Sequence, residues 1–342
     1  MDSKCCDHGG ATTTISAVHT DVIESHILTK FDGASLACAA STSHLLHNLC
    51  NKQSLWEDVC NATWDSIKDP LVRKTISDFS GGYRGFYSDA FPVIRSKHGR
   101  DKKYHYEGNI SELISAVDIH YGDEQIFSKV IVTDTDNKSF LHFSFWVDLF
   151  DNKQTVKIPL KFEGDEKKCM LELEQNLKLS WIVIDPTKKR AVNVSSLRPV
   201  SVQPSWNGYD IQVIFATILS GEYDVEGSDL VECRVAATLG CKEGKYVKFR
   251  EVILYSEDMQ MRRLSGKKSL KILEQAMESG ERKKENGGEM KEIYEKYLDL
   301  KRNKMEGKKR KERVLNLVYK LSWVAYFFAF VFLCSSLNVF PN

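Results

Sequence analysis

The sequence predicts an α+β fold, with short N-terminal helices, a mainly antiparallel β-sandwich-like domain, a charged helical spacer and a C-terminal apolar helix. Apolar residues recur at helical spacing in short segments between residues 15 and 64. From about residue 110, short β-branched and aromatic runs are joined by turns rather than by long helices, which favours antiparallel pairing. Near the end, a stretch rich in Lys, Glu and Arg gives way to an uncharged apolar run.

The composition excludes several classes of protein. The chain has 342 residues, of which 28% are charged and 42% hydrophobic, and its net charge is +1. These values are typical of an ordinary globular protein, and they give no reason to expect nucleic acid as a partner. Nine cysteines without a Cys-x-x-Cys pair indicate neither a disulfide framework nor a zinc site. No cofactor is expected.

The first 14 residues are small, polar and rich in threonine, which predicts a disordered tail. They contain no apolar segment of the kind that a signal peptide requires. We therefore expect the body of the protein in the reducing cytosol, with the nucleus as the alternative.

The first helix is predicted to begin near Thr20, whose hydroxyl could cap the first turn. Asp32-Gly33 is predicted to end it, because glycine tolerates the left-handed backbone of helix ends. Further short helices are expected at residues 34–41, around Leu45 and Leu49, and at 54–60. Helices this short bury little apolar surface alone, so they must dock on the rest of the chain or on a partner. The apolar stripe of the first helix consists of Val22, Ile23, Ile27, Leu28 and Phe31.

The apolar pairs at both ends of residues 15–64 resemble an F-box. This family has a first helix of the Leu-Pro-x-x-Leu-Leu-x-x-Ile-Leu kind and closes with Leu-Trp-x-x-Leu/Val-Cys. Here Val22-Ile23 and Ile27-Leu28 match the first helix, and Leu55-Trp56 begins the matching close. The sequence departs from the pattern twice, with Val18-His19 in place of Leu-Pro and His44 or Leu45 in place of a tryptophan in the middle.

The resemblance implies a non-catalytic adaptor. F-box segments bind the Skp1 subunit of SCF (Skp1–cullin–F-box) ubiquitin ligases and, through it, a cullin, while the rest of the chain recognises a protein substrate. Trp56 is either an anchor for Skp1 or a residue that holds the box's own helices together. The alternative to an F-box is a helical cap whose stripe is ordinary core. By resemblance, the Skp1-binding residues would be Val22, Ile23, Ile27, Leu28, Phe31, Leu36, Leu55, Trp56 and Val59.

After the box, residues 65–109 are expected to form a connector of loops and one short helix, and residues 110–280 a β-rich substrate-recognition domain. Phe140 to Leu149 alternates apolar and polar residues, which predicts a half-buried strand. Asp165 to Asn176 has helical spacing and interrupts the strands. Seven other strands are predicted at 114–120, 126–133, 177–184, 191–195, 211–219, 230–239 and 246–255.

The segment SWIVIDPTKKRAVNVSSLRPVSVQPSW, Ser180 to Trp206, resembles the signature of a plant F-box family with a β-rich C-terminal half. The run REVILYSEDMQ and the helix expected at SLKILEQAM, Ser269 to Met277, are similar to the same family. A remote similarity, resting on strand pattern and aromatic content, is to phloem-lectin-like F-box proteins. A rival interpretation from another class is a carbohydrate- or lipid-associated binding module with a helical N-terminal cap.

Residues 281–313 are predicted to form a solvated charged spacer, in which Ile293, Tyr297 and Leu300 lie on one helical seam. The basic run Lys308 to Arg313 is a nuclear signal, a phosphate-binding patch or the cytosolic flank of a membrane segment. The segment that follows favours the third interpretation.

Residues 314–342 are predicted to hold a C-terminal membrane anchor. The run Leu321 to Phe340 is uncharged and reaches the ~20 residues that a spanning helix needs. The basic flank keeps the body on the cytoplasmic face, as expected of a tail anchor. The alternative is a C-terminal strand or helix docked on the sandwich. The predicted membrane residues include Leu321, Trp323, Tyr326, Phe328, Phe330, Phe332, Leu333 and Phe340.

Motifs for catalysis are missing from the sequence. It contains no GxGxxG, GxxxxGK[ST], GxSxG or HExxH, and Gly81 to Gly85 lacks the Lys-Ser of a phosphate-binding loop. His44 and His47 share a spacing of three but have no third metal ligand placed by sequence. We therefore do not expect an enzyme or a metal site.

Overall fold

The computed structural model describes residues 18–96, 110–151, 154–206, 208–224, 227–241, 246–283 and 288–337. The predicted disordered tail and Phe340 lie outside these residues. The described chain combines short N-terminal helices, antiparallel sheets and a long C-terminal helix, so the predicted α+β fold is confirmed.

The N-terminal segment folds as a series of short helices that are less regular than predicted. Instead of one helix from Thr20, the chain forms three kinds of helical turn in succession, and His19 rather than Thr20 is the N-cap. The helices are α1 (Thr20–Val22), the π-helical η2 (Ile23–Ile27), the 3₁₀-helical η3 (Leu28–Lys30), α2 (Gly33–Ala40), α3 (His44–Cys50), α4 (Gln53–Thr63), η4 (Asp65–Lys68), α5 (Pro70–Ser77) and α6 (Gly82–Asp89).

Local capping explains why several of these helices begin where they do. Asp32 accepts a hydrogen bond from the Ser35 amide at 2.9 Å, and Asp69, followed by Pro70 in the first turn, accepts from the Leu71 amide. The connector therefore holds η4, α5 and α6 where one short helix was expected; this expectation was wrong.

Gly33 has a different role from the predicted one. Its backbone is not left-handed, and it begins α2 rather than ending the first helix. A Cβ atom at this position would lie 2.3 Å from Cζ of Tyr87, so the close approach of α2 to α6 requires glycine.

Two antiparallel sheets form the sandwich. The four-stranded sheet has the order β3 (Glu124–Asp134), β2 (Glu112–Tyr121), β6 (Leu177–Asp185), β7 (Arg190–Asn193). The six-stranded sheet has the order β4 (Trp146–Asp148), β11 (Tyr246–Asp258), β10 (Gly227–Gly240), β9 (Asp210–Asp224), β8 (Ser201–Pro204), and β5 (Val156–Lys161) also pairs with β11. A two-stranded sheet joins β1 (Val93–Ser96) to β12 (Gly280–Arg282).

The core of the sandwich lies between the two larger sheets. Inward-facing residues alternate with outward-facing ones, as in Val117 and Ile119 of β2 or Val213 and Phe215 of β9. Trp181 of β6 is completely buried among them.

The predicted strand from Phe140 to Leu149 is mostly not a strand. Asn137 caps a short helix, α7 (Lys138–His142), and only the three residues of β4 pair with β11. Phe145, Val147 and Leu149 are buried as the alternation predicted, but Phe143 is exposed at the end of α7. The alternation therefore predicted the buried side chains correctly only in the second half of this segment, which reaches the sheet.

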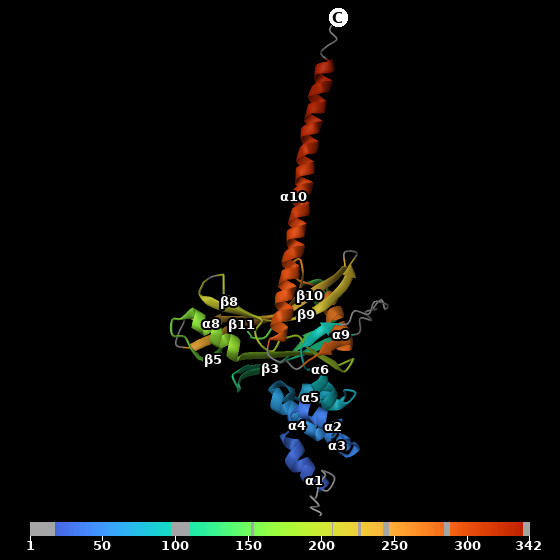
Figure 1. The fold of residues 1–342 in the computed structure, drawn as a ribbon, viewed down its shortest axis with the longest axis vertical. Helices are drawn as coiled ribbons and strands as arrows, with labels where there is room; N and C mark the ends of the chain where they lie inside the picture. Colours follow the sequence, from blue (N-terminus) through green and yellow to red (C-terminus); the bar gives the residue numbers. More distant parts are fainter. Residues whose placement is uncertain are drawn as a thin grey trace, which may run out of the picture.

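Three longer helices complete the fold. The predicted helices α8 (Glu166–Asn176) and α9 (Gly266–Ser279) pack on the sandwich, and α9 contributes Leu270, Leu273 and Met277 to its core. The last helix, α10 (Glu289–Leu337), begins on the six-stranded sheet and then leaves it. Figure 1 shows α10 rising from one side of the sheets, with the N-terminal helices at the opposite end of the molecule.

Candidate functional site

The N-terminal helices share one hydrophobic core with the outer face of the four-stranded sheet. Residues of α2 to α6 pack with Ile114 and Ala116 of β2, Ile182 and Ile184 of β6 and Ala191 of β7. Of the two expectations for these helices, docking on the rest of the chain accounts for most of their apolar surface. Among the nine predicted Skp1-binding residues, five are buried in this core, namely Ile23, Leu28, Leu36, Leu55 and Trp56.

The remaining four predicted residues keep accessible surface. Val22 is 43% exposed, and Ile27, Phe31 and Val59 are half-buried. Val18, just before α1, and Leu45 of α3 were not among the predicted contacts but are also accessible. These helices lie at the end of the molecule farthest from α10 (Figure 1). An apolar surface therefore remains on the N-terminal helices, but it is smaller than the sequence suggested.

Trp56 connects α4 to α3 and to α6. Its side chain is 2% exposed, and its Nε1 donates to the carbonyl oxygen of Cys50 at 2.7 Å. Its ring lies 5.3 Å from the ring of Tyr87, and the Arg84 guanidinium lies 5.7 Å from its centroid. This geometry favours the second of the two roles considered for Trp56, which is to hold the box together.

Buried polar contacts fix the helices that follow the box to the sandwich. The Asp118 carboxylate of β2 accepts from the amide of Ser66 at 2.8 Å and from its hydroxyl at 2.5 Å. Burial raises the pKa of Asp118, and the hydrogen bonds from Ser66 oppose that rise. Asp89 at the end of α6 accepts two hydrogen bonds from Arg190 of β7. The N-terminal helices and the four-stranded sheet are therefore one packed unit.

The first part of the expected charged spacer is also packed rather than solvated. Met290, Tyr294 and Tyr297 of α10 are buried against Ile214 and Ala216 of β9. Along the predicted seam, Tyr297 is buried and Ile293 half-buried, but Leu300 is exposed.

A buried ionic cluster fastens α10 to the six-stranded sheet. Lys301 donates to Glu257 of β11 at 2.7 Å and lies 3.7 Å from Glu232 of β10, which in turn pairs with Arg234. Burial alone would lower the pKa of Arg234, but its hydrogen bonds to Glu232 raise it above the ordinary value. We call Glu232, Arg234, Glu257 and Lys301 the α10 latch.

Beyond the latch, α10 is exposed and increasingly apolar. It is the one helix in the described part of the chain that is long and apolar enough to cross a membrane, judged by length and composition. The alternative of an apolar end docked on the sandwich is wrong for the described residues, because none of this stretch is buried. The predicted membrane residues Leu321, Trp323, Tyr326, Phe328, Phe330, Phe332 and Leu333 are all exposed.

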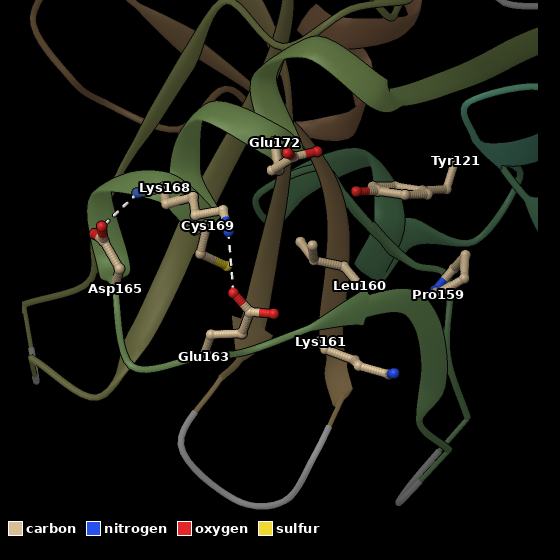
Figure 2. A pocket seen from close by; sticks show the side chains of 9 residues that line it. All are labelled: Tyr121, Pro159, Leu160, Lys161, Glu163, Asp165, Lys168, Cys169 and Glu172. Carbon is tan, nitrogen blue, oxygen red and sulfur yellow. Dashed lines mark hydrogen bonds and ion pairs between the residues drawn. The ribbon is translucent and has the colours of Figure 1, made fainter.

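A hollow of about 340 Å³ lies beside α8 (Figure 2). Lys168 donates to Glu163 at 3.0 Å, and its amide donates to Asp165, so these lining charges pair with one another. Tyr121 and Cys169 lie on the other walls. Within the described ranges, no group of three or more His, Cys, Asp or Glu side chains is placed to hold a metal.

Comparison with known proteins decides the family. The chain is 38% identical over 341 residues to F-box protein At3g44326 of Arabidopsis thaliana. The aligned region covers 97% of this chain and 93% of the relative. The chain belongs to the plant F-box proteins. This F-box protein is also 35% identical to F-box protein At2g27310 and 37% identical to Probable F-box protein At2g36090 of the same plant, with 94% of the chain covered in each case and 97% and 94% of the relatives.

The resemblance found in the sequence is thus confirmed at the level of the family. No protein-family model matches this F-box protein, and no solved structure matches it.

Proposed function

We propose that this F-box protein is the substrate-recognition adaptor of an SCF ubiquitin ligase. Its N-terminal helices bind a Skp1-like protein and thereby a cullin, and its β-rich domain binds a target protein. The observation that carries the proposal is membership of the F-box family over nearly the whole chain. The accessible apolar residues Val22, Ile27, Phe31 and Val59 support it, because they leave a surface for a partner.

The adaptor performs no chemistry of its own in this proposal. It acts by proximity, since it holds a target lysine within reach of a conjugating enzyme that the cullin recruits. Because the box and the sandwich share a core, the distance between bound Skp1 and bound target is set by the fold.

Copurification with a Skp1-like protein tests the proposal. Val22→Glu places a charge in the accessible stripe without opening the core, whereas truncating Leu55 or Trp56 would test folding instead of binding. Leu71→Glu is a matched control, because Leu71 of α5 is 39% exposed and lies outside the predicted contacts. We expect wild type and Leu71→Glu to bind and Val22→Glu to lose binding. A folded wild type that never binds would overturn the adaptor and favour the non-ligase binding module.

We also infer that the apolar part of α10 spans a membrane and keeps the body on the cytosolic face. The support is an exposed apolar helix preceded by the basic run Lys308 to Arg313, which suits the anionic inner leaflet. Carbonate extraction tests the inference. The full chain should stay in the membrane pellet, and a chain that lacks residues 321–342 should not; a wild type that washes off would exclude a spanning helix.

A further inference from the structure

Strand β3 is a long edge of the four-stranded sheet. Among the described residues it is hydrogen-bonded to β2 and to no other strand, although β5 of the opposite sheet also contacts it. It pairs with β2 along its whole length, from Asp134 opposite Glu112 to Glu124 opposite Tyr121. In an antiparallel pair, alternate residues turn their N–H and C=O groups away from the partner. Within the described ranges, no backbone hydrogen bond joins β3 to any element besides β2. These outward groups are therefore available to a further strand.

The side chains of β3 are much less covered than those of its neighbour β2, which is an independent indication that a further strand can dock here. Residues 113–119 of its neighbour β2 are all buried, whereas none of the eleven residues of β3 is. Ile126, Phe127, Val130 and Ile131 are only half-buried, and Val132 is 48% exposed. These apolar residues lie on both faces of the sheet, so a strand added beside β3 would cover them.

The other edges of the sandwich carry the usual protection against pairing. At the two ends of the six-stranded sheet, β4 has three residues, and β8 has four and ends in Pro204. By contrast, β3 has eleven residues and no proline. Its pairing with β2 has one bulge, at Ile126 near the hairpin end, and its Lys129 side chain turns inward to Leu149 and Asp151 of the opposite layer. The bulge and the inward-turned lysine give this edge partial protection. The regularly paired stretch from Phe127 to Asp134 is still long enough to accept a strand.

A second copy of this chain is a poor occupant. Two β3 strands paired antiparallel over their full length would place Lys129 opposite Lys129 and Glu124 opposite Asp134, so like charges would face one another. Acidic residues flank the edge at both ends, with Asp123 and Glu124 at one and Asp134 and Asp136 at the other. They favour an incoming segment that carries basic residues on both sides of an apolar run.

We propose that β3 is the target-docking edge, and that it receives an extended apolar segment, flanked by Lys or Arg, as a fifth strand of the sheet. This assignment rests on the proposed function in that the segment belongs to the target protein. Strand β3 also contacts η4 and contributes Val130 to the core shared with the box. Figure 1 shows β3 on the side of the sandwich that faces the N-terminal helices, so a docked target lies on the Skp1 side of the molecule.

Peptide binding to the full chain in detergent micelles, without Skp1, tests the proposal. The probe is a fluorescein-labelled peptide, KKVTVTVTVKK, measured by anisotropy. We expect saturable binding that weakens by roughly tenfold or more when the flanks become Glu or when the valine amides are N-methylated, because either change removes a predicted contact.

Two variants of the protein make the test specific to the edge. Val132→Lys adds the kind of charge that protects natural edges and should weaken binding by roughly tenfold or more. Leu171→Lys is the matched control on α8, where Leu171 is 54% exposed, and it should bind like wild type. Circular dichroism of both variants checks that the fold is kept.

Hydrogen exchange over residues 124–134 completes the test. Alternate β3 amides should exchange quickly in the free protein and slowly with the peptide. The proposal is overturned if the peptide does not bind, if these amides are already slow in the free monomer, or if the chain sediments as a dimer that protects them. Skp1 is absent from this experiment, so a negative result does not contradict the proposed adaptor function. Conversely, peptide binding without Skp1 copurification would contradict the adaptor function but not the docking edge.

Discussion

Trp56 combines a buried ring with a buried hydrogen bond, so its replacement tests the core that joins the box helices. Trp56→Phe removes the donor to the Cys50 carbonyl and leaves part of the ring volume empty. We expect a loss of about 2–4 kcal/mol in the free energy of unfolding, from the unpaired carbonyl and the cavity together. Urea unfolding of the full chain in detergent, followed by circular dichroism, measures it.

Trp146→Phe is the matched control, because Trp146 is more than half exposed at the edge strand β4. It should change the free energy of unfolding by less than about 0.5 kcal/mol. Equal effects of the two replacements would show that Trp56 is not the internal anchor described here.

His120 at the end of β2 gives the fold a pH dependence. Burial lowers its pKa below the ordinary value, and this effect outweighs the nearby Asp118 carboxylate, which raises it. As the pH falls through about 6.5, the unfolded chain therefore takes up a proton that the folded chain does not, and stability decreases. His120→Gln should flatten the change in urea midpoint between pH 7.5 and pH 5.5; an unchanged slope would assign the pH dependence to other groups.

At the scale of elements, the α10 latch holds the long helix on the six-stranded sheet. Lys301→Met removes the cation from Glu257 and leaves that largely buried carboxylate without this partner. We expect the docking of residues 289–301 to weaken by about 2 kcal/mol, seen as faster amide hydrogen exchange in this segment. Lys296→Met on the exposed side of the same helix is the control and should leave exchange unchanged. Equal exchange in both variants would mean that the aromatic contacts alone dock the helix.

Period-2 patterns predicted most strands because each strand of the sandwich has one face in a core. The pattern gave the wrong element from Phe140 to His142, where an Asn137 cap and contacts with α9 extend the helix α7 over residues that also alternate. The edge position of β3 could not be predicted, because the order of strands in a sheet is set by long-range pairing and not by local pattern.

The sequence predicted the family, but it did not predict which residues of the candidate surface are accessible. The apolar pairs of the box indicated the family, yet they could not separate residues that face a partner from residues that face α6, as Trp56 shows. Lys301 was taken as part of a solvated run, since a charged residue on a helix is usually solvated; its burial depends on Glu232 and Glu257, which lie far away in sequence. The spacing of Met290, Tyr294 and Tyr297 was the one local signal for that contact.

At the scale of the whole molecule, the box and the apolar end of α10 lie at opposite ends (Figure 1). Between Lys301 of the latch and Leu321, the helix rises about 30 Å at 1.5 Å per residue. With its apolar part in a bilayer, this geometry holds the sandwich off the membrane and turns the box toward the cytosol. If the proposed anchor and adaptor roles both hold, we expect targets to lie within a limited height above the bilayer.

Liposome flotation is the most direct test of this arrangement. The full chain is inserted into liposomes, a soluble Skp1-like protein is added outside, and the fractions are separated on a density gradient. The account predicts that Skp1 floats with wild type and with Leu71→Glu but stays at the bottom with Val22→Glu. Skp1 that remains at the bottom while the wild-type chain floats would contradict the central claim that this membrane-tethered chain presents a working F-box.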